Sequence, residues 1–136
     1  MNEKNLGFTL IELVIVLAIV AIIGAILIPN FINTTDRARL RSDVQSARIL
    51  QNALELYNVE QPNPMALGTA AQVIEQLDRL GYVEARRVVE QTTGANFSVV
   101  SGRIVLDISG ASDSIRALYS MLSEQERRYV SGGISN

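Results

Sequence analysis

The sequence predicts an α+β protein in which one long N-terminal helix packs against a small domain with a short antiparallel sheet and one or two additional helices. Three observations support this prediction: an apolar run over residues 8–28, a helical apolar stripe that continues to about Asn58, and alternating apolar residues within 97–108. The chain has 136 residues, which is enough for one modest domain.

The apolar run at residues 8–28 contains one charged residue, Glu12, and one other polar side chain, Thr9. As a helix it spans about 30 Å, close to the hydrocarbon thickness of a bilayer. A small domain cannot surround a helix that is apolar on every side, which disfavours a buried core helix. The run is too long for the core of a secretory signal, and no small-residue cleavage site follows it. We therefore expect residues 8–29 to cross a membrane and to stay attached.

The segment before the helix, residues 1–7, is short and polar, and its only basic side chain is Lys4. Positive charge favours the cytoplasmic side of a membrane. This places the N-terminus in the cytoplasm and the rest of the chain outside it.

Glu12 needs an explanation, because an acid within a spanning helix costs about 1–3 kcal/mol unless it has a partner. Either its carboxylate lies near enough to the interface to stay hydrated, or a second chain supplies a positive charge. No cation of this chain lies within a helical turn of Glu12, and Lys4 is too far back.

The residues at this end of the chain resemble a known signal. The string GFTLIE at residues 7–12 follows a polar leader and opens an uninterrupted apolar helix that ends in Pro29. This combination of a glycine, an adjacent aromatic residue and a glutamate at the head of an apolar run resembles the class III signal of the type IV pilin and pseudopilin family. The resemblance is close over about residues 1–35 and extends to the remainder only in general plan.

This resemblance implies that a prepilin peptidase cleaves after Gly7 and methylates the new amino group of Phe8. Residues 1–7 are then a leader peptide, 8–29 a membrane anchor that becomes the filament core, and 30–136 an extracytoplasmic domain.

The resemblance also implies the missing partner of Glu12, which is the Phe8 amine of a neighbouring subunit. The carboxylate and the ammonium attract each other strongly in a medium of low dielectric constant, and either group is costly to bury without the other. The pair therefore favours the correct axial register between subunits. Gly24 and Pro29 either let the helix bend or melt when it packs with others, or are ordinary features of a spanning helix.

The implied partners are the prepilin peptidase, copies of the chain in a helical filament, an inner-membrane assembly platform with its ATPase, and membrane lipid before assembly. The implied location is a single-pass membrane protein with a cytoplasmic N-terminus, and afterwards a cell-surface or periplasmic filament.

Beyond Pro29 the composition becomes rich in arginine, with Arg37, Arg39 and Arg41 close together. On a helix leaving the membrane these side chains either bind lipid headgroups and then acidic groups of neighbouring subunits, or form a solvated face.

The remaining elements follow from spacing. Apolar residues at intervals of three and four continue the long helix to about Asn58, namely Leu40, Val44, Ala47, Leu50, Leu54 and Tyr57. The segment Gln61–Pro64 then breaks the helix. A capping box at Thr69 and Gln72 predicts a second helix of about 11 residues that closes at Gly81, with Val73, Ile74, Leu77 and Leu80 on one face.

Alternation predicts two strands, Phe97–Val100 and Arg103–Ile108, joined by a tight turn at Ser101-Gly102. The segment Tyr82–Val89 is a further candidate strand. A third helix is expected to start after Ser112 and to run toward Tyr129, with Ile115, Leu118, Tyr119 and Leu122 on its apolar face.

Composition excludes most catalytic chemistry. The chain has no Cys and no His, and its only Lys is in the leader, so Cys–His, Ser–His and Ser–Lys arrangements cannot be assembled. No calcium-loop spacing is present, and we expect no catalytic residue, no cofactor and no metal site. The net charge of −2 and the lack of a motif give no reason to expect direct nucleic-acid binding.

The sequence therefore predicts a structural subunit of a type IV pilus-like filament and no enzyme. A pseudopilin of a type II secretion or DNA-uptake system is the alternative, although the Tyr-Pro-rich loop and acidic ligands usual in major secretion pseudopilins are missing. A signal-anchored extracytoplasmic binding domain is a remote alternative.

Overall fold

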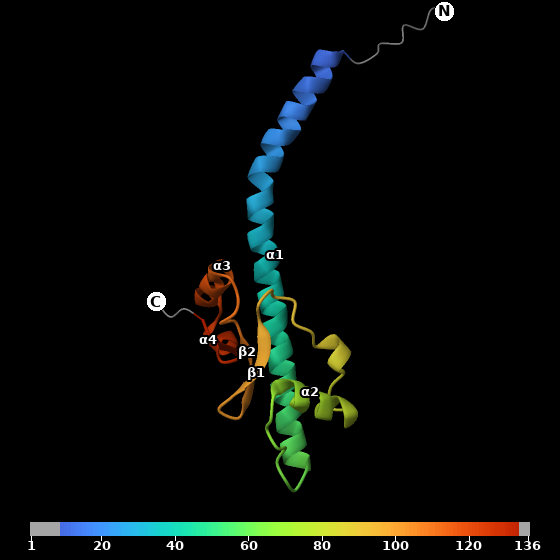
Figure 1. The fold of residues 1–136 in the computed structure, drawn as a ribbon, viewed down its shortest axis with the longest axis vertical. Helices are drawn as coiled ribbons and strands as arrows, with labels where there is room; N and C mark the ends of the chain where they lie inside the picture. The colour runs from blue at the N-terminus through green and yellow to red at the C-terminus, as the bar shows by residue number, and fades with distance from the viewer. Residues whose placement is uncertain (1–8, 134–136) are drawn as a thin grey trace, which may run out of the picture. The chain divides into compact units, whose positions relative to one another are not determined.

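The computed structural model describes residues 9–133, with the side chains of residues 28–33 left out of that description. In chain order the elements are α1 (Leu10–Glu60), α2 (Ala70–Arg79), η1 (Ala85–Arg87), β1 (Asn96–Val100), β2 (Arg103–Asp107), α3 (Asp113–Ala117), η2 (Leu118–Met121), α4 (Glu124–Arg127) and β3 (Val130–Ser131) (Figure 1). The α+β class predicted from the sequence is confirmed. The contacts divide the chain into two compact units, with the boundary between Thr35 and Asp36.

The first unit, in its described part, is the N-terminal portion of α1. It contains a helical window, Leu10–Leu27, with a mean hydropathy of 3.1 and none of its residues buried. By length and composition this window is able to cross a membrane.

The second unit is built around the C-terminal portion of α1. The stripe predicted by spacing is buried at Leu40, Val44, Ala47, Leu50 and Leu54. The core is completed by apolar side chains from the loops, the sheet and the later helices, which are Met65, Val73, Leu77, Val88, Phe97, Ile104, Leu106, Ile108, Ile115, Leu122 and Val130.

Helix α2 begins and ends as predicted. Thr69 is its N-cap and forms a capping box with Gln72, and the chain turns away at Gly81, where φ is +80°. Val73 and Leu77 are buried. Leu80, which the spacing places on the same apolar face, is instead 55% exposed at the end of the helix.

The predicted hairpin is present, and β1 pairs antiparallel with β2. Its turn residues Ser101 and Gly102 both have positive φ values, 52° and 80°, as a two-residue turn between twisted strands requires. The sequence did not predict β3, which pairs parallel to β2 and makes the three-stranded sheet mixed. The backbone N–H groups of Leu106 and Ile108 donate to the carbonyls of Tyr129 and Ser131 at 2.8 and 3.0 Å.

Two expectations about the later segments are wrong. The segment Tyr82–Val89 holds the short 3₁₀ helix η1 rather than a strand, because the Asp78 carboxylate accepts from the Ala85 N–H at 3.0 Å and starts a helical turn.

The single C-terminal helix expected up to Tyr129 is instead α3, η2 and α4. Leu122 is extended, with a ψ of 146°, which buries its side chain and ends the first helical segment. Ser123 and Glu126 then form a new capping box that starts α4.

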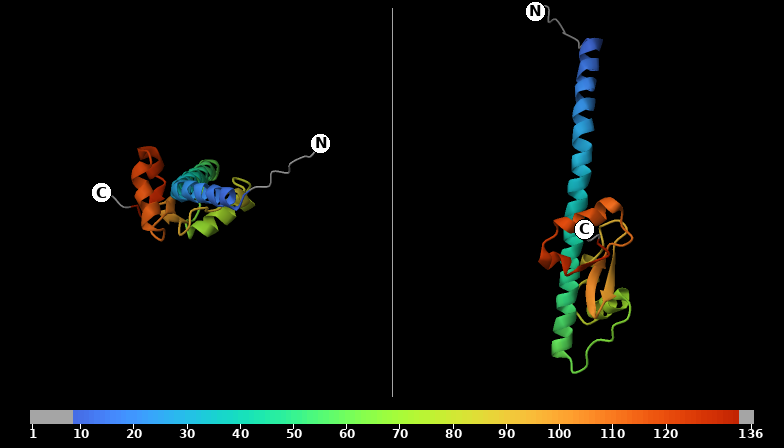
Figure 2. Two further views of the ribbon diagram at one scale, coloured as in Figure 1. Left: turned by 90° about the horizontal axis from the view of Figure 1, so that it is seen from above. Right: turned by 90° about the vertical axis from the view of Figure 1, so that its left-hand side faces the viewer.

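Within the second unit, α2 and η1 lie on one side of α1, and α3 and α4 lie on the other (Figure 2, left). The hairpin β1–β2 runs alongside α1 in the side view (Figure 2, right).

Two buried polar side chains join α1 to the rest of this unit. Asp43 is fully buried, and its carboxylate accepts from the backbone N–H groups of Gln91 and Thr92 at 3.0 and 2.7 Å. Gln51 accepts from the Ile104 N–H of β2 at 2.8 Å. Each side chain accepts from backbone donors that would be costly to bury without a partner. Asp43 therefore fixes the loop that precedes β1 against α1, and Gln51 fixes β2 against α1.

Candidate functional site

The N-terminal end of α1 is where the sequence places the assembly residues. Gly7 and Phe8 lie outside the described residues. Glu12 Oε2 accepts from the Thr9 N–H at 2.8 Å and from the Thr9 hydroxyl at 2.9 Å, and the Glu12 N–H donates to Thr9 Oγ1 at 3.3 Å. These bonds form a capping box for the first turn of α1.

The sequence analysis missed this local role of Glu12, although the spacing of a threonine three residues before a glutamate signals it. The cap uses one carboxylate oxygen, and within residues 9–133 no guanidinium lies within ion-pair distance of Glu12. Both hydrogen bonds from Thr9 go to Oε2, so the cap leaves the second carboxylate oxygen of Glu12 without a hydrogen-bond donor among the described residues.

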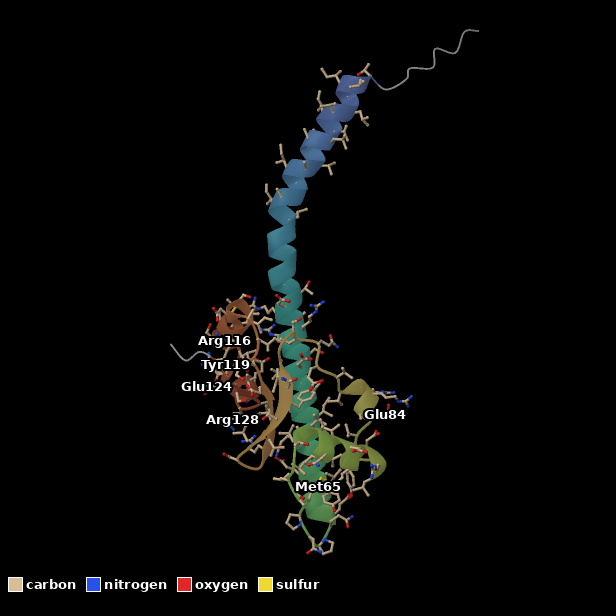
Figure 3. All side chains as sticks on the ribbon, in the orientation of Figure 1. Met65, Glu84, Arg116, Tyr119, Glu124 and Arg128 are labelled. Carbon is tan, nitrogen blue, oxygen red and sulfur yellow. The ribbon has the colours of Figure 1, made fainter. Side chains whose placement is uncertain are left out.

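The large apolar side chains that follow Glu12 are exposed. They project on all sides of the helix (Figure 3). Each large apolar side chain between Leu13 and Leu27 is at least 50% exposed. Such a continuous apolar surface requires lipid or other apolar helices as its surroundings.

Gly24 and Pro29 both lie inside this helix. No atom lies within 4 Å of the position that a Cβ on Gly24 would occupy, so the glycine is a gap in the apolar surface. The backbone of Pro29 is helical, and α1 continues through it to Glu60.

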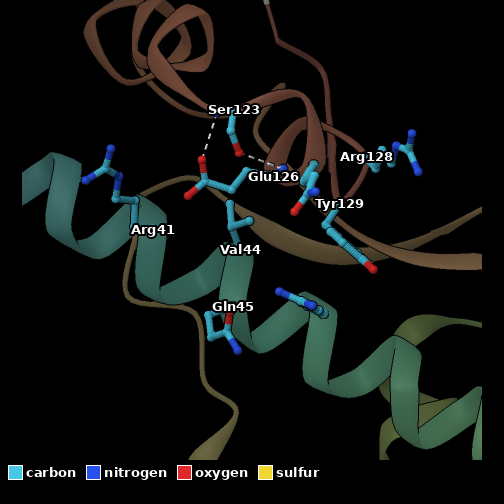
Figure 4. Close-up of a pocket in the computed structure, with 9 residues that line it drawn as sticks. Arg41, Val44, Gln45, Ser123, Glu126, Arg128 and Tyr129 are labelled. Carbon is cyan, nitrogen blue, oxygen red and sulfur yellow. Dashed lines mark hydrogen bonds between the residues drawn. The ribbon is translucent and has the colours of Figure 1, made fainter.

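The three arginines singled out from the sequence have different surroundings. Arg39 lies 3.9 Å from the Asp36 carboxylate, and Arg37 is exposed. Arg41 lines a cavity of about 560 Å³ between α1 and α4 (Figure 4), together with Val44, Gln45, Arg48, Ser123, Gln125, Glu126, Arg128 and Tyr129. Arg128 was not singled out from the sequence, because its position beside Arg41 depends on how α4 folds back on α1.

Glu126 is the acidic side chain of this cavity. The N–H and the hydroxyl of Ser123 hold its pKa below the ordinary value of 4.5, and the nearby charge of Arg41 acts in the same direction. Figure 4 shows the two bonds between Ser123 and Glu126, and it places Arg41 and Arg128 on either side of Glu126.

The part of the chain that the structure describes contains no group of three or more Asp, Glu, His or Cys side chains that could hold a metal ion. Several of its titratable groups form exposed ion pairs, such as Arg79 with Glu75 and Arg87 with Glu84. These arrangements stabilise local structure and assemble no acid, base and nucleophile around one point.

Comparison with known proteins agrees with the N-terminal features. Residues 3–28 match the family model described as the prokaryotic N-terminal methylation motif. The chain is 31% identical over 118 residues to a fimbrial protein of Neisseria meningitidis serogroup A, an alignment that covers 86% of this chain and 68% of the relative.

Other relatives match over the N-terminal part. A type II secretion system core protein G of Escherichia coli is 29% identical, and a prepilin peptidase-dependent protein A of Clostridium perfringens is 42% identical, each over 59 residues. These alignments cover 43% of this chain, which spans 41% of the length of each of the two relatives. No solved structure is significantly similar to the chain.

A long apolar half-helix that carries a methylation motif and continues into a small α+β domain defines the class of type IV filament subunits. The chain belongs to the type IV pilin and pseudopilin family.

Proposed function

We propose that the chain is a structural subunit of a type IV pilus-like filament, inserted in the membrane, processed after Gly7, N-methylated at Phe8 and polymerised through the N-terminal half of α1. The observation that carries this proposal is the exposed apolar window Leu10–Leu27 directly behind the methylation motif. Lipid covers this window before assembly, and the same segments of other subunits cover it afterwards.

In this proposal residues 1–7 lie in the cytoplasm, and residues 30–136 form the extracytoplasmic domain. A prepilin peptidase removes the leader, and an inner-membrane platform with its ATPase draws the processed subunit from the bilayer into the filament.

Glu12 has two functions in the proposal. It caps the first turn of α1 through Thr9, and its charge pairs with the Phe8 amine of a neighbouring subunit. The bonds to Thr9 use one oxygen, so a single carboxylate is able to do both. The pair selects the axial register of the subunit, because a shifted neighbour leaves the carboxylate and the ammonium unpaired in an apolar core.

Substitutions at Glu12 separate these two functions. Glu12→Gln keeps an acceptor for the cap and removes the charge, whereas Glu12→Ala removes both. We expect both variants to insert in the membrane and both to lose most of their filament yield, measured in sheared surface material against the membrane-bound pool. Thr9→Ala is the matched control, because it weakens the cap and leaves the charge. Filament yield that stays normal in Glu12→Gln contradicts the pairing.

The second candidate is a pseudopilin of a type II secretion or DNA-uptake system. The similarity to a protein named type II secretion system core protein G favours this candidate. A processed chain that stays in the envelope and is missing from sheared material supports this candidate over a surface pilus.

Of the three N-terminal arginines, we propose Arg41 as the interface residue. Arg39 has an intramolecular acidic neighbour, and Arg37 lies away from the cavity between α1 and α4.

A further inference from the structure

The cavity between α1 and α4 has more positive than negative charge. Arg41 and Arg48 come from α1, Arg128 follows α4, and all three side chains are exposed. We refer to the surface formed by these three arginines as the basic groove. Arg41 and Arg48 are seven residues apart on one helix, so they lie on the same face, two turns from each other.

The three arginines of the basic groove form no ion pair within residues 9–133, and Glu126 is the one acidic side chain that lines the cavity with them. The ion pairs in this part of the chain engage Arg39, Arg79, Arg87 and Arg116, and none of the three groove arginines. The one carboxylate that lines the cavity, Glu126, already accepts a hydrogen bond from the Ser123 N–H, and the backbone N–H of Glu126 donates to Ser123 Oγ. Guanidinium groups bind carboxylates through paired hydrogen bonds, so the groove is suited to acidic side chains.

An acidic surface of the same chain matches this requirement. Glu75 and Asp78 lie three residues apart on α2, and Glu90 lines the same depression beside them. Glu75 also forms an exposed ion pair with Arg79, whereas Asp78 and Glu90 form none within the described residues. We refer to these three residues as the acidic face of α2. Asp78 and Glu90 each use one oxygen to accept a backbone N–H, from Ala85 and Phe97, which orients the carboxylate and leaves its other oxygen exposed to a partner.

The two surfaces lie on different sides of the second unit. Figure 3 shows Arg128 on one side of α1 and Glu84, which precedes the η1 residue Ala85, on the other. The groove lies between α1 and α4, and the acidic face lines a separate depression beside α2. Because a subunit cannot fold its own α2 into its own groove, the two surfaces are able to meet only between two copies.

We propose that the basic groove of one subunit binds the acidic face of α2 of a second copy of the chain. The contact rests on the proposed filament function and adds to it the surface that joins neighbouring domains. Contacts between two different surfaces of one chain do not close on themselves unless the rotation forms a ring, so they build an open helical array. The charge distribution favours a second copy as occupant, because basic residues outnumber acidic ones in 36–50, which contains Arg41 and Arg48, and acidic residues outnumber basic ones in 51–100.

Cysteine cross-linking is a direct test, because the full chain has no Cys of its own. Two tagged full-length copies are expressed together, one with Gln45→Cys in the groove wall and one with Ala71→Cys beside the acidic face. Oxidation of sheared filaments is expected to give a mixed disulfide dimer that carries both tags. The control replaces Ala71→Cys by Ser114→Cys, an exposed site on α3, and is expected to give no such dimer.

Charge reversal supplies a second, independent test. The double variant Arg48→Glu, Arg128→Glu is expected to lower filament yield about tenfold at an unchanged level of membrane-bound protein. Adding Glu75→Arg to the same chain is expected to recover part of the yield, because it restores opposite charges across the contact. Arg37→Glu is the matched control, since this exposed arginine is outside the groove.

The outcomes separate this contact from the filament function itself. Filaments that form without the mixed disulfide, and with normal yield from the double variant, overturn the contact and leave the filament function intact. A loss of yield with neither the disulfide nor the recovery also overturns it and points to another anion, such as a lipid headgroup. A wild-type chain that never assembles overturns the filament function, and the contact with it.

Discussion

The two ends of α1 have the same backbone and opposite environments. Leu17, in the N-terminal part, is 60% exposed, whereas Leu50, in the C-terminal part, is fully buried. Both belong to regular apolar patterns, but the first pattern surrounds the helix and the second forms one stripe. The difference shows that the C-terminal part completes its environment within the chain, while the N-terminal part depends on surroundings that the chain does not supply.

The same substitution at these two positions gives the largest expected contrast. Leu50→Ala removes a fully buried side chain and leaves a cavity, so we expect it to lower the free energy of unfolding of the second unit by about 3 kcal/mol. Leu17→Ala touches no core and is expected to leave that free energy unchanged. Urea unfolding of the full chain in detergent, followed by protease resistance of the domain, measures both.

The comparison fails if the two variants unfold alike. Equal destabilisation would mean that the N-terminal part of α1 packs on the domain, and equal stability would mean that the buried stripe contributes little.

The next largest effect is expected at Asp43, where a charge rather than an apolar side chain holds the C-terminal part of α1. Asp43→Asn replaces one accepting oxygen by a donor that faces the N–H groups of Gln91 and Thr92, so we expect a loss of about 2 kcal/mol in unfolding free energy. Asp36→Asn is the matched control, because Asp36 has only a long contact to Arg39. Similar unfolding midpoints for the two variants would contradict a structural role of Asp43.

A smaller and pH-dependent effect is expected at the start of α4. Ser123→Ala removes the N-cap hydroxyl and is expected to cost about 1 kcal/mol at neutral pH. The hydrogen bonds from Ser123 lower the pKa of Glu126 in the folded chain, so their stabilisation is present above the unfolded value near 4.5.

As the pH falls through the lowered pKa, Glu126 is protonated and this stabilisation is lost. The stability difference between the wild-type chain and Ser123→Ala is therefore expected to shrink in acid, which thermal unfolding at a series of pH values would show. A difference that stays constant down to pH 3 would mean that the charge of Glu126 contributes nothing to the cap.

The elements that could be predicted from the sequence are those fixed by nearby residues. The stripe on α1 follows from its spacing, α2 from the box of Thr69 and Gln72, and the hairpin from the turn at Ser101-Gly102. Each of these signals involves residues within a few positions of each other, so a periodic or capping pattern is enough to find it.

The features that could not be predicted depend on residues distant in the sequence. In the sequence, Asp43 is one charged residue within a helical pattern. Its hydrogen-bond donors are the backbone N–H groups of residues 91 and 92, which are 48 and 49 residues away. Strand β3 is two residues long and forms because β2 offers an open edge. Arg128 enters the basic groove for the same reason, since α4 must first fold back onto α1.

The most direct test of the filament function is the N-terminal sequence and intact mass of the protein, purified both from its native membrane and from sheared surface material. The account predicts a chain in the sheared fraction that begins at N-methylated Phe8, with residues 1–7 removed. A chain that still begins at Met1 in both fractions would contradict processing after Gly7, and with it the conversion of a membrane anchor into a filament core.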